Sequence, residues 1–193
     1  MNPQFWWYVA RASGIVAWLM LTASVIWGVI LSTKAFPEHR RPAWLLDLHR
    51  WLGGLTMSFV AIHLGALVAD NYTHFNLSDL AIPYASDWKP GAVALGVIAA
   101  WLLAAVELTS LAIKRLPKRV WRSIHLTSYA VFWLTSIHAT LAGTDRANSL
   151  YQLTAAASII AVAWALAYRL TTRRATNRPT RARPTAPLTA KHH

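Results

Sequence analysis

Several residue types and motifs are scarce or missing in this sequence. It has no cysteine, which excludes disulfides, thiolate metal sites, iron–sulfur clusters and thiol catalysis. No glycine-rich dinucleotide fingerprint is present, so we expect that the chain does not itself take hydride from a nicotinamide. Charged residues make up only 13% of the 193 residues, whereas about 25% is usual in a soluble domain. The low charge indicates a membrane protein.

Apolar residues make up 55% of the chain and fall in long runs. Runs of this length cross a bilayer as helices. We predict an all-α integral membrane bundle of five transmembrane helices, with a short interfacial helix over residues 77–82. The five spans cover about residues 5–31, 44–69, 91–113, 120–141 and 150–170. They form one domain, residues 1–170, and the basic remainder, residues 171–193, is predicted to be disordered because its composition cannot build a core.

The net charge of +12 lies mainly in the loops and the tail. The tail and the loops that follow the first and third spans carry most of the lysines and arginines. The other two loops carry aspartates and few cations. The positive-inside rule predicts that the N-terminus is outside and the C-terminus is cytoplasmic in a multi-pass protein of the cell (plasma) membrane. Nucleic acid is a poor candidate partner, because no basic patch lies on a folded domain.

Two of the predicted spans carry histidines in pairs. His49 and His63 are 14 residues apart on the second span, and His125 and His138 are 13 residues apart on the fourth. Fourteen helical residues measure about 21 Å, in a bilayer core about 30 Å thick. Both spans run from inside to outside, so we expect His49 to lie level with His125, and His63 level with His138.

These pairs predict metal ligation, because an ionisable residue inside a bilayer is costly and marks a functional site by default. A single histidine there can also be a packed residue that bonds a neighbouring helix, but four histidines in two level pairs make this interpretation weak. Zinc needs about four ligands close together, whereas each level offers two imidazoles, with Asp47 the only carboxylate near either. Two facing imidazoles are enough for a haem iron, because the porphyrin supplies the other four ligands. We therefore predict an inner haem iron held by His49 and His125, and an outer one held by His63 and His138.

The spacing of 13 residues does not fit a regular helix as well as 14 does. Thirteen residues leave the second histidine about 140° from the first around the helix, and fourteen leave it about 40° away. Either the fourth span is distorted, for example by a π-bulge, or the two haems approach it from different sides. Small residues on the two spans either make room for a macrocycle or simply pack the helices together; they are Gly53, Gly54, Gly65, Ser128 and Ser136.

Haem carboxylates need basic partners at the membrane edges, where guanidinium matches carboxylate well. At the inner edge Arg50, Arg119 and Arg122 are placed for this, although the positive-inside rule alone would put arginines there. Cations are few at the outer edge. Among them we predict Arg146 as a carboxylate partner, while Arg11 either snorkels to the surface or binds a haem carboxylate.

The motif His49-Arg50 with His63, and the run from Val120 to His138, resemble the ferric reductase transmembrane domain superfamily. That group includes NADPH oxidases, eukaryotic ferric reductases and the haem-binding membrane subunit of bacterial methionine sulfoxide reductase systems. The resemblance covers about residues 44–170, and it is specific in the histidine spacing. It implies two haems b, bis-histidine ligation and electrons carried one at a time across the membrane. The oxidases differ in having six spans, with histidines on the third and fifth, and in continuing into a flavin and nicotinamide domain.

We therefore interpret the chain as a transmembrane electron-transfer b-type cytochrome, an oxidoreductase component that lacks its own FAD/NAD(P)H domain. Electrons would come from a separate flavoprotein on the cytoplasmic side and pass to an external acceptor, such as ferric iron or a flavin-binding partner. One alternative is a quinol-linked haem subunit that feeds a partner reductase. A second is a non-redox membrane subunit or transporter whose histidines relay protons or bind metal.

Overall fold

The computed structural model describes residues 4–33, 42–70 and 75–176. These residues form helices and no strand, as predicted. Short 3₁₀ turns, η2 (Ile113–Arg115) and η3 (Asp145–Ala147), join some of the α-helices. The α-helices are α1 (Phe5–Ser32), α2 (Trp44–Ala69), α3 (Leu77–Ala81), α4 (Pro90–Leu111), α5 (Lys118–Leu126), α6 (Ser128–Ala142) and α7 (Ser149–Thr176).

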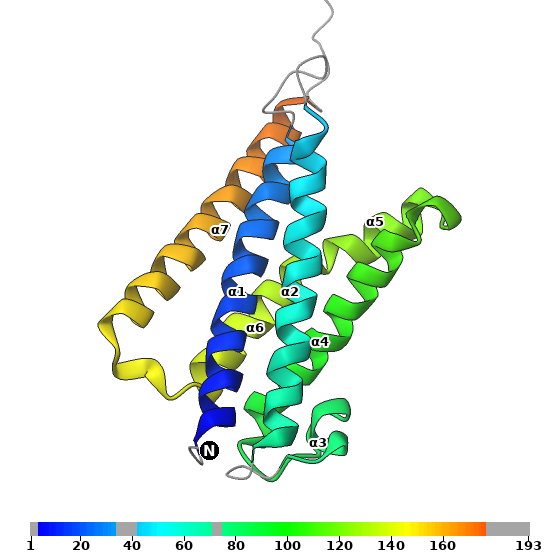
Figure 1. Ribbon diagram of the computed structural model, residues 1–193. Helices are drawn as coiled ribbons and strands as arrows, with labels where there is room; N and C mark the ends of the chain where they lie inside the picture. The colour runs from blue at the N-terminus through cyan, green and yellow to red at the C-terminus, as the bar shows by residue number, and fades with distance from the viewer. Residues whose placement is uncertain (1–3, 34–41, 71–74, 177–193) are drawn as a thin grey trace, which may run out of the picture.

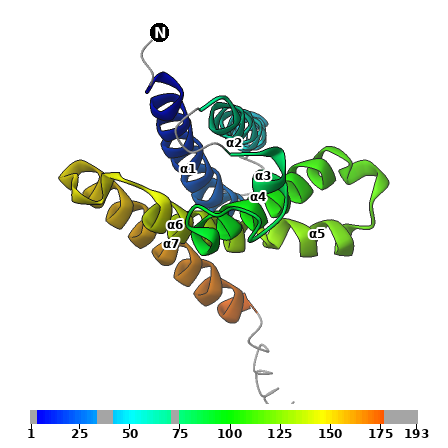
Figure 2. The same cartoon turned by 90° about the horizontal axis from the view of Figure 1, so that it is seen from below.

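Two antiparallel hairpins make up most of the bundle (Figure 1). In the first hairpin α1 rises from the N-terminus and α2 returns along it. In the second hairpin α4 rises, and α5 and α6 return. The histidine-bearing segments, α2 and α5 with α6, therefore run in the same direction. Helix α7 packs along α1, and the view from below shows α4 and α5 slanting away from the first hairpin (Figure 2).

Proline and polar caps set several of the helix ends. Pro90 is the first residue of α4, where its missing N–H costs no hydrogen bond. Asn76 and Asp79 form a capping box that starts the five-residue α3. Pro117 directly precedes α5, so the chain can turn sharply between α4 and α5.

Four helical segments are long and apolar enough to cross a membrane: α1, α2, α4 and Ser149–Thr172 of α7. Their outward side chains are also apolar. Trp51, Trp101 and Trp164 are 70%, 60% and 71% exposed on the surface of the bundle. Water would make such a surface costly, whereas lipid tails solvate it. The chain is therefore an all-α membrane bundle.

The predicted fourth span, residues 120–141, is not one helix. It is divided between α5 and α6 at Thr127, whose N–H donates to the Ile124 carbonyl at 2.9 Å, three residues back. Neither part alone is long enough to count as a span, so four helices in the described ranges meet that test where five were predicted. A 3₁₀ turn advances each residue by about 120°, against 100° in an α-helix. The distortion is therefore a tightened turn rather than a π-bulge, and it moves His138 toward the face of His125.

The other predicted boundaries differ from the structure by only a few residues. Helix α2 begins and ends where the second span was predicted. Helix α7 continues to Thr176, six residues beyond the predicted end of its span. Residues 177–193 lie outside the described residues, so the predicted disorder of the tail stays a prediction.

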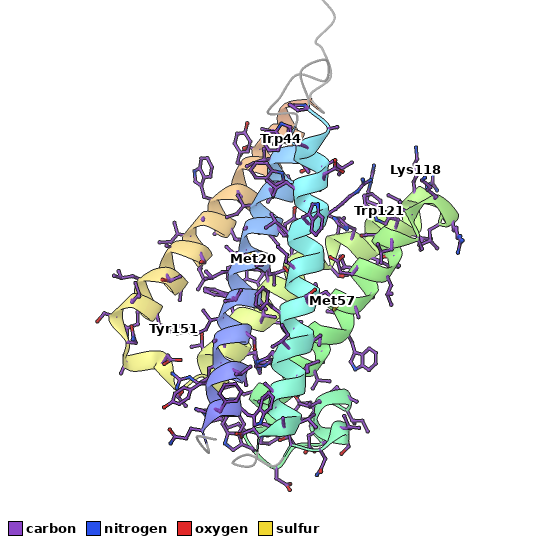
Figure 3. All side chains as sticks on the ribbon, in the orientation of Figure 1. Met20, Trp44, Met57, Lys118, Trp121 and Tyr151 are labelled. Atoms are coloured by element: carbon purple, nitrogen blue, oxygen red, sulfur yellow. The ribbon has the colours of Figure 1, made fainter. Side chains whose placement is uncertain are left out.

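A buried apolar cluster joins the helices at mid-height. It contains Trp18, Leu21, Val25, Ala99, Leu103, Val131, Phe132 and Val162. The Trp18 ring stacks on Phe132 with centroids 6.4 Å apart, and its indole N–H donates to the Ser136 hydroxyl at 3.0 Å. Met20 and Met57 mark this middle zone in Figure 3, between Trp44 at one end and Tyr151 toward the other.

Candidate functional site

The four predicted histidines come from three helices. His49 and His63 lie on α2, His125 on α5 and His138 on α6. The structure brings His49 and His125 together, with ring centroids 5.9 Å apart and ring planes at 74°. We call this pair the inner level, after its predicted side of the membrane. It lies toward the end of the bundle where Trp44, Lys118 and Trp121 are labelled in Figure 3.

We call the second predicted pair, His63 and His138, the outer level; both residues line one cavity. The wall of this cavity also includes Gly14 and Trp18 of α1 and Gly96 of α4, and most of its other lining residues are apolar. Arg11 and Asp145 line it as well. The cavity therefore offers two imidazoles in apolar surroundings with a charged pair beside them.

At the outer level the Nδ1 atom of each imidazole is bound by a backbone carbonyl. His63 Nδ1 lies 2.7 Å from the Ala10 carbonyl of α1, and His138 Nδ1 lies 2.7 Å from the Ala92 carbonyl of α4. A carbonyl oxygen only accepts, so Nδ1 must carry the proton and Nε2 keeps its lone pair. Metal-binding histidines are usually oriented by such a bond from the other ring nitrogen.

At the inner level serine hydroxyls take the place of the carbonyls. Ser24 Oγ lies 3.3 Å from His49 Nδ1, and Ser110 Oγ lies 3.3 Å from His125 Nδ1. These contacts are longer than the carbonyl contacts. Because a hydroxyl both donates and accepts, they do not impose one tautomer. Trp121 stacks on the His125 ring, with the ring centroids 4.9 Å apart, and supports it from one side.

Glycines give three of the imidazoles room against the neighbouring helix. A methyl group on Gly14 would stand 3.0 Å from His63 Nδ1, and one on Gly28 would stand 3.2 Å from His49 Cε1. On Gly96 it would stand 2.8 Å from His138 Nδ1. Sequence reasoning missed these residues, although Gly14 and Gly28 repeat the 14-residue spacing of His49 and His63.

The small residues chosen from sequence lie elsewhere. A methyl group on Gly54 or Gly65 would meet no other atom within 4 Å, and both glycines are on exposed surface. Gly53 packs against the Glu107 carboxyl of α4 instead of a histidine. Ser136 is buried and accepts the bond from Trp18. Of this set, Gly53 and Ser136 thus serve helix packing.

The arginines chosen from sequence are exposed wherever the structure describes their side chains. Arg50 lies 3.3 Å from Asp47 on an exposed face, and Arg119 and Arg122 are exposed on α5. Arg146 belongs to η3, but its side chain lies outside the described part of the chain. These residues remain predictions as carboxylate partners.

Two other arginines make definite contacts. Arg11 forms a two-point ion pair with Asp145 of η3, one bond of which is 3.1 Å. This pair ties α1 to the connection between α6 and α7. Arg169 of α7 bonds the Tyr129 hydroxyl of α6 and lies 5.4 Å from its ring centroid. Sequence reasoning passed over Arg169 because its partner is on another helix.

The donor set suits a ligand that needs two imidazoles. No group of three or more histidine or carboxylate side chains is placed to hold a metal ion among the residues that the structure describes. When two imidazoles ligate one metal ion, the distance between their ring centroids is two metal–nitrogen bonds of about 2 Å plus the distance from each nitrogen to its ring centroid. The sum is roughly 6 Å. The 5.9 Å between the His49 and His125 centroids fits that span. The residues present therefore fit a bis-histidine haem at the inner level.

The fold and the site define a class: a helical membrane bundle with histidines paired at two depths. The family model of the ferric reductase-like transmembrane component matches residues 13–136, more than half of the sequence. The chain belongs to this family, which indicates a membrane electron-transfer component. The match includes His49, His63 and His125 and ends two residues before His138. No curated protein and no solved structure matches the sequence.

Proposed function

We propose that this chain is a transmembrane b-type cytochrome with two bis-histidine haems. The observation that carries the proposal is the pairing of His49 and His125 across the two hairpins at 5.9 Å. The carbonyl bonds to Nδ1 of His63 and His138 support the outer site, because they leave both Nε2 atoms free to ligate. Family membership supports the same function.

In this proposal the protein binds, orients and insulates, and a bound haem supplies one-electron iron chemistry. His49 and His125 hold the inner iron, and His63 and His138 hold the outer iron. The buried cluster around Trp18 and Phe132 keeps water from the space between the levels. Because each haem would be held by two histidines, it would supply electron transfer to an acceptor rather than bind that acceptor at the iron.

The proposed topology has five crossings, with α5 and α6 together making the fourth. Residues 118–142 measure about 37 Å as helix, enough for a bilayer core of about 30 Å. The N-terminus is outside and the C-terminus is cytoplasmic in the cell membrane. The charge at the start of α5 supports this orientation, since Lys114, Arg115 and Lys118 cluster there.

The electron donor is proposed to be a separate flavoprotein that docks on the basic inner face, because opposite charges steer such encounters. The acceptor is outside, either ferric iron or a flavin-binding partner protein. A quinol-linked subunit that feeds a partner reductase is the alternative, and it is favoured if quinol reduces the haems without added protein.

Haem content tests the proposal directly. The purified full chain should show the reduced α-band of a b-type cytochrome and two haems per chain. His63→Ala should leave one haem, whereas His74→Ala, in a loop according to the sequence, should leave two. A colourless protein made with full haem supply would contradict the proposal and favour a non-redox role for the histidines.

A further inference from the structure

The two hairpins hold their outer histidines in the same way. In α1 the Ala10 carbonyl binds the imidazole and Gly14, four residues later, makes room for it. In α4 the Ala92 carbonyl and Gly96 repeat this arrangement with the same spacing. The inner histidines differ, because each contacts a serine hydroxyl at 3.3 Å.

We propose that this difference sets the order of the two haem potentials, with the outer haem lower than the inner. The inference rests on the proposed function. A strong acceptor at Nδ1 raises the basicity of the ligating imidazole, and a more basic ligand stabilises ferric iron over ferrous iron. The backbone carbonyls at the outer level, 2.7 Å from Nδ1, are stronger acceptors than the serine hydroxyls at the inner level. Ser24 and Ser110 are thus positioning residues that lower the inner potential, but by less than the carbonyls lower the outer one.

Charged side chains near the two levels also change the haem potentials, and some raise the potential while others lower it. Arg169 bonds the hydroxyl of Tyr129, which follows His125 by four residues, and a cation there favours the reduced inner haem. At the outer level Arg11 and Asp145 neutralise each other. Glu107 packs on Gly53, one helical turn from His49, and an ionised carboxylate there would lower the inner potential. The hydrogen-bond effect is therefore measured with Glu107 present and with Glu107→Gln.

The test uses the full-length, haem-loaded protein and measures midpoint potentials by spectroelectrochemical titration. His63→Ala retains only the inner haem, and His49→Ala retains only the outer. We expect the inner midpoint to be the higher, both with Glu107 and with Glu107→Gln. Ser24→Ala and Ser110→Ala should each raise the inner midpoint further, because the imidazole then loses its acceptor. Ser24→Thr and Ser110→Thr retain the hydroxyl and should restore the original value.

Ser58→Ala is the matched control, because the Ser58 hydroxyl is exposed on α2 and bonds the Gly54 carbonyl of its own helix. It should move neither midpoint. If a single-histidine variant does not fold, the two-haem protein gives the same answer, since the serine variants should move only the higher of its two reduction waves. An inner midpoint at or below the outer, or a shift of the lower wave, overturns the inference. Absence of haem contradicts the proposed function instead.

Discussion

Gly96 of α4 faces His138 of α6 so closely that a methyl group on the glycine would stand 2.8 Å from the imidazole Nδ1. Atoms at that distance overlap. Either the ring or the helix must move, and the bond from His138 to the Ala92 carbonyl depends on both. The placement of the outer imidazole is therefore decided by the helix opposite it as much as by its own.

Gly96→Ala should cost the outer haem and leave the inner one. Overpacking of this kind destabilises by about 1–3 kcal/mol, and here the strain falls on the ligand itself. Haem counted per chain should fall from two to one. Gly54→Ala is the matched control, because a methyl group there meets open space, and it should retain both haems. Two haems in Gly96→Ala would show that the contact yields at no cost to ligation.

The ion pair between Arg11 and Asp145 should contribute to stability, because both side chains are largely shielded, with 32% and 24% exposed. A double-mutant cycle with Arg11→Ala and Asp145→Ala should give a coupling of about 1 kcal/mol, between the values for exposed and buried pairs. Unfolding in detergent measures it. The exposed pair of Asp47 and Arg50, 56% and 66% exposed, is the control and should give a coupling near zero. Equal couplings in the two cycles would contradict the prediction.

Ser136→Ala should destabilise the bundle without removing haem. The Trp18 indole N–H is buried and donates to this hydroxyl, and a buried donor without a partner costs about 1–3 kcal/mol. Thermal unfolding of the loaded protein should show a lower midpoint with two haems retained. Ser58→Ala, on exposed surface, should leave the unfolding temperature unchanged. A loss of haem in Ser136→Ala would mean that this bond orients His138 as well.

Insertion of one alanine between Thr127 and Ser128 tests the tightened turn. It makes the spacing of His125 and His138 equal to the 14 residues of the first pair, but it turns α6 by about 100° relative to α5. His138 should then leave the cavity and the outer haem should be lost. The inner haem serves as the internal control and should remain. Retention of both haems would show that the backbone absorbs the extra residue elsewhere.

Much of the helix arrangement could be predicted because it follows from local sequence patterns. Long apolar runs placed α2 correctly from Trp44 to Ala69, and the histidine spacing indicated which residues share a depth. The division of residues 120–141 at Thr127 is a backbone detail that apolar composition does not encode. The 13-residue spacing was its only trace in the sequence.

The contacts between helices were harder to predict, because they depend on how the hairpins face each other. Gly14 and Gly28 repeat the histidine spacing, yet only the packing of α1 against α2 shows that they lie opposite the imidazoles. The serine contacts at Ser24 and Ser110 depend on the same packing. The contact of Arg169 could not be predicted from the sequence, because its partner Tyr129 is 40 positions away on another helix.

Electron tunnelling slows steeply as the gap between two centres widens. On one hairpin that gap would be fixed by the unbroken rod of α2, and on the other by the joint at Thr127. In the proposed cytochrome, α2 would therefore set the rate of transfer through the distance it fixes, and the joint at Thr127 would bring His125 and His138 to the depths of His49 and His63.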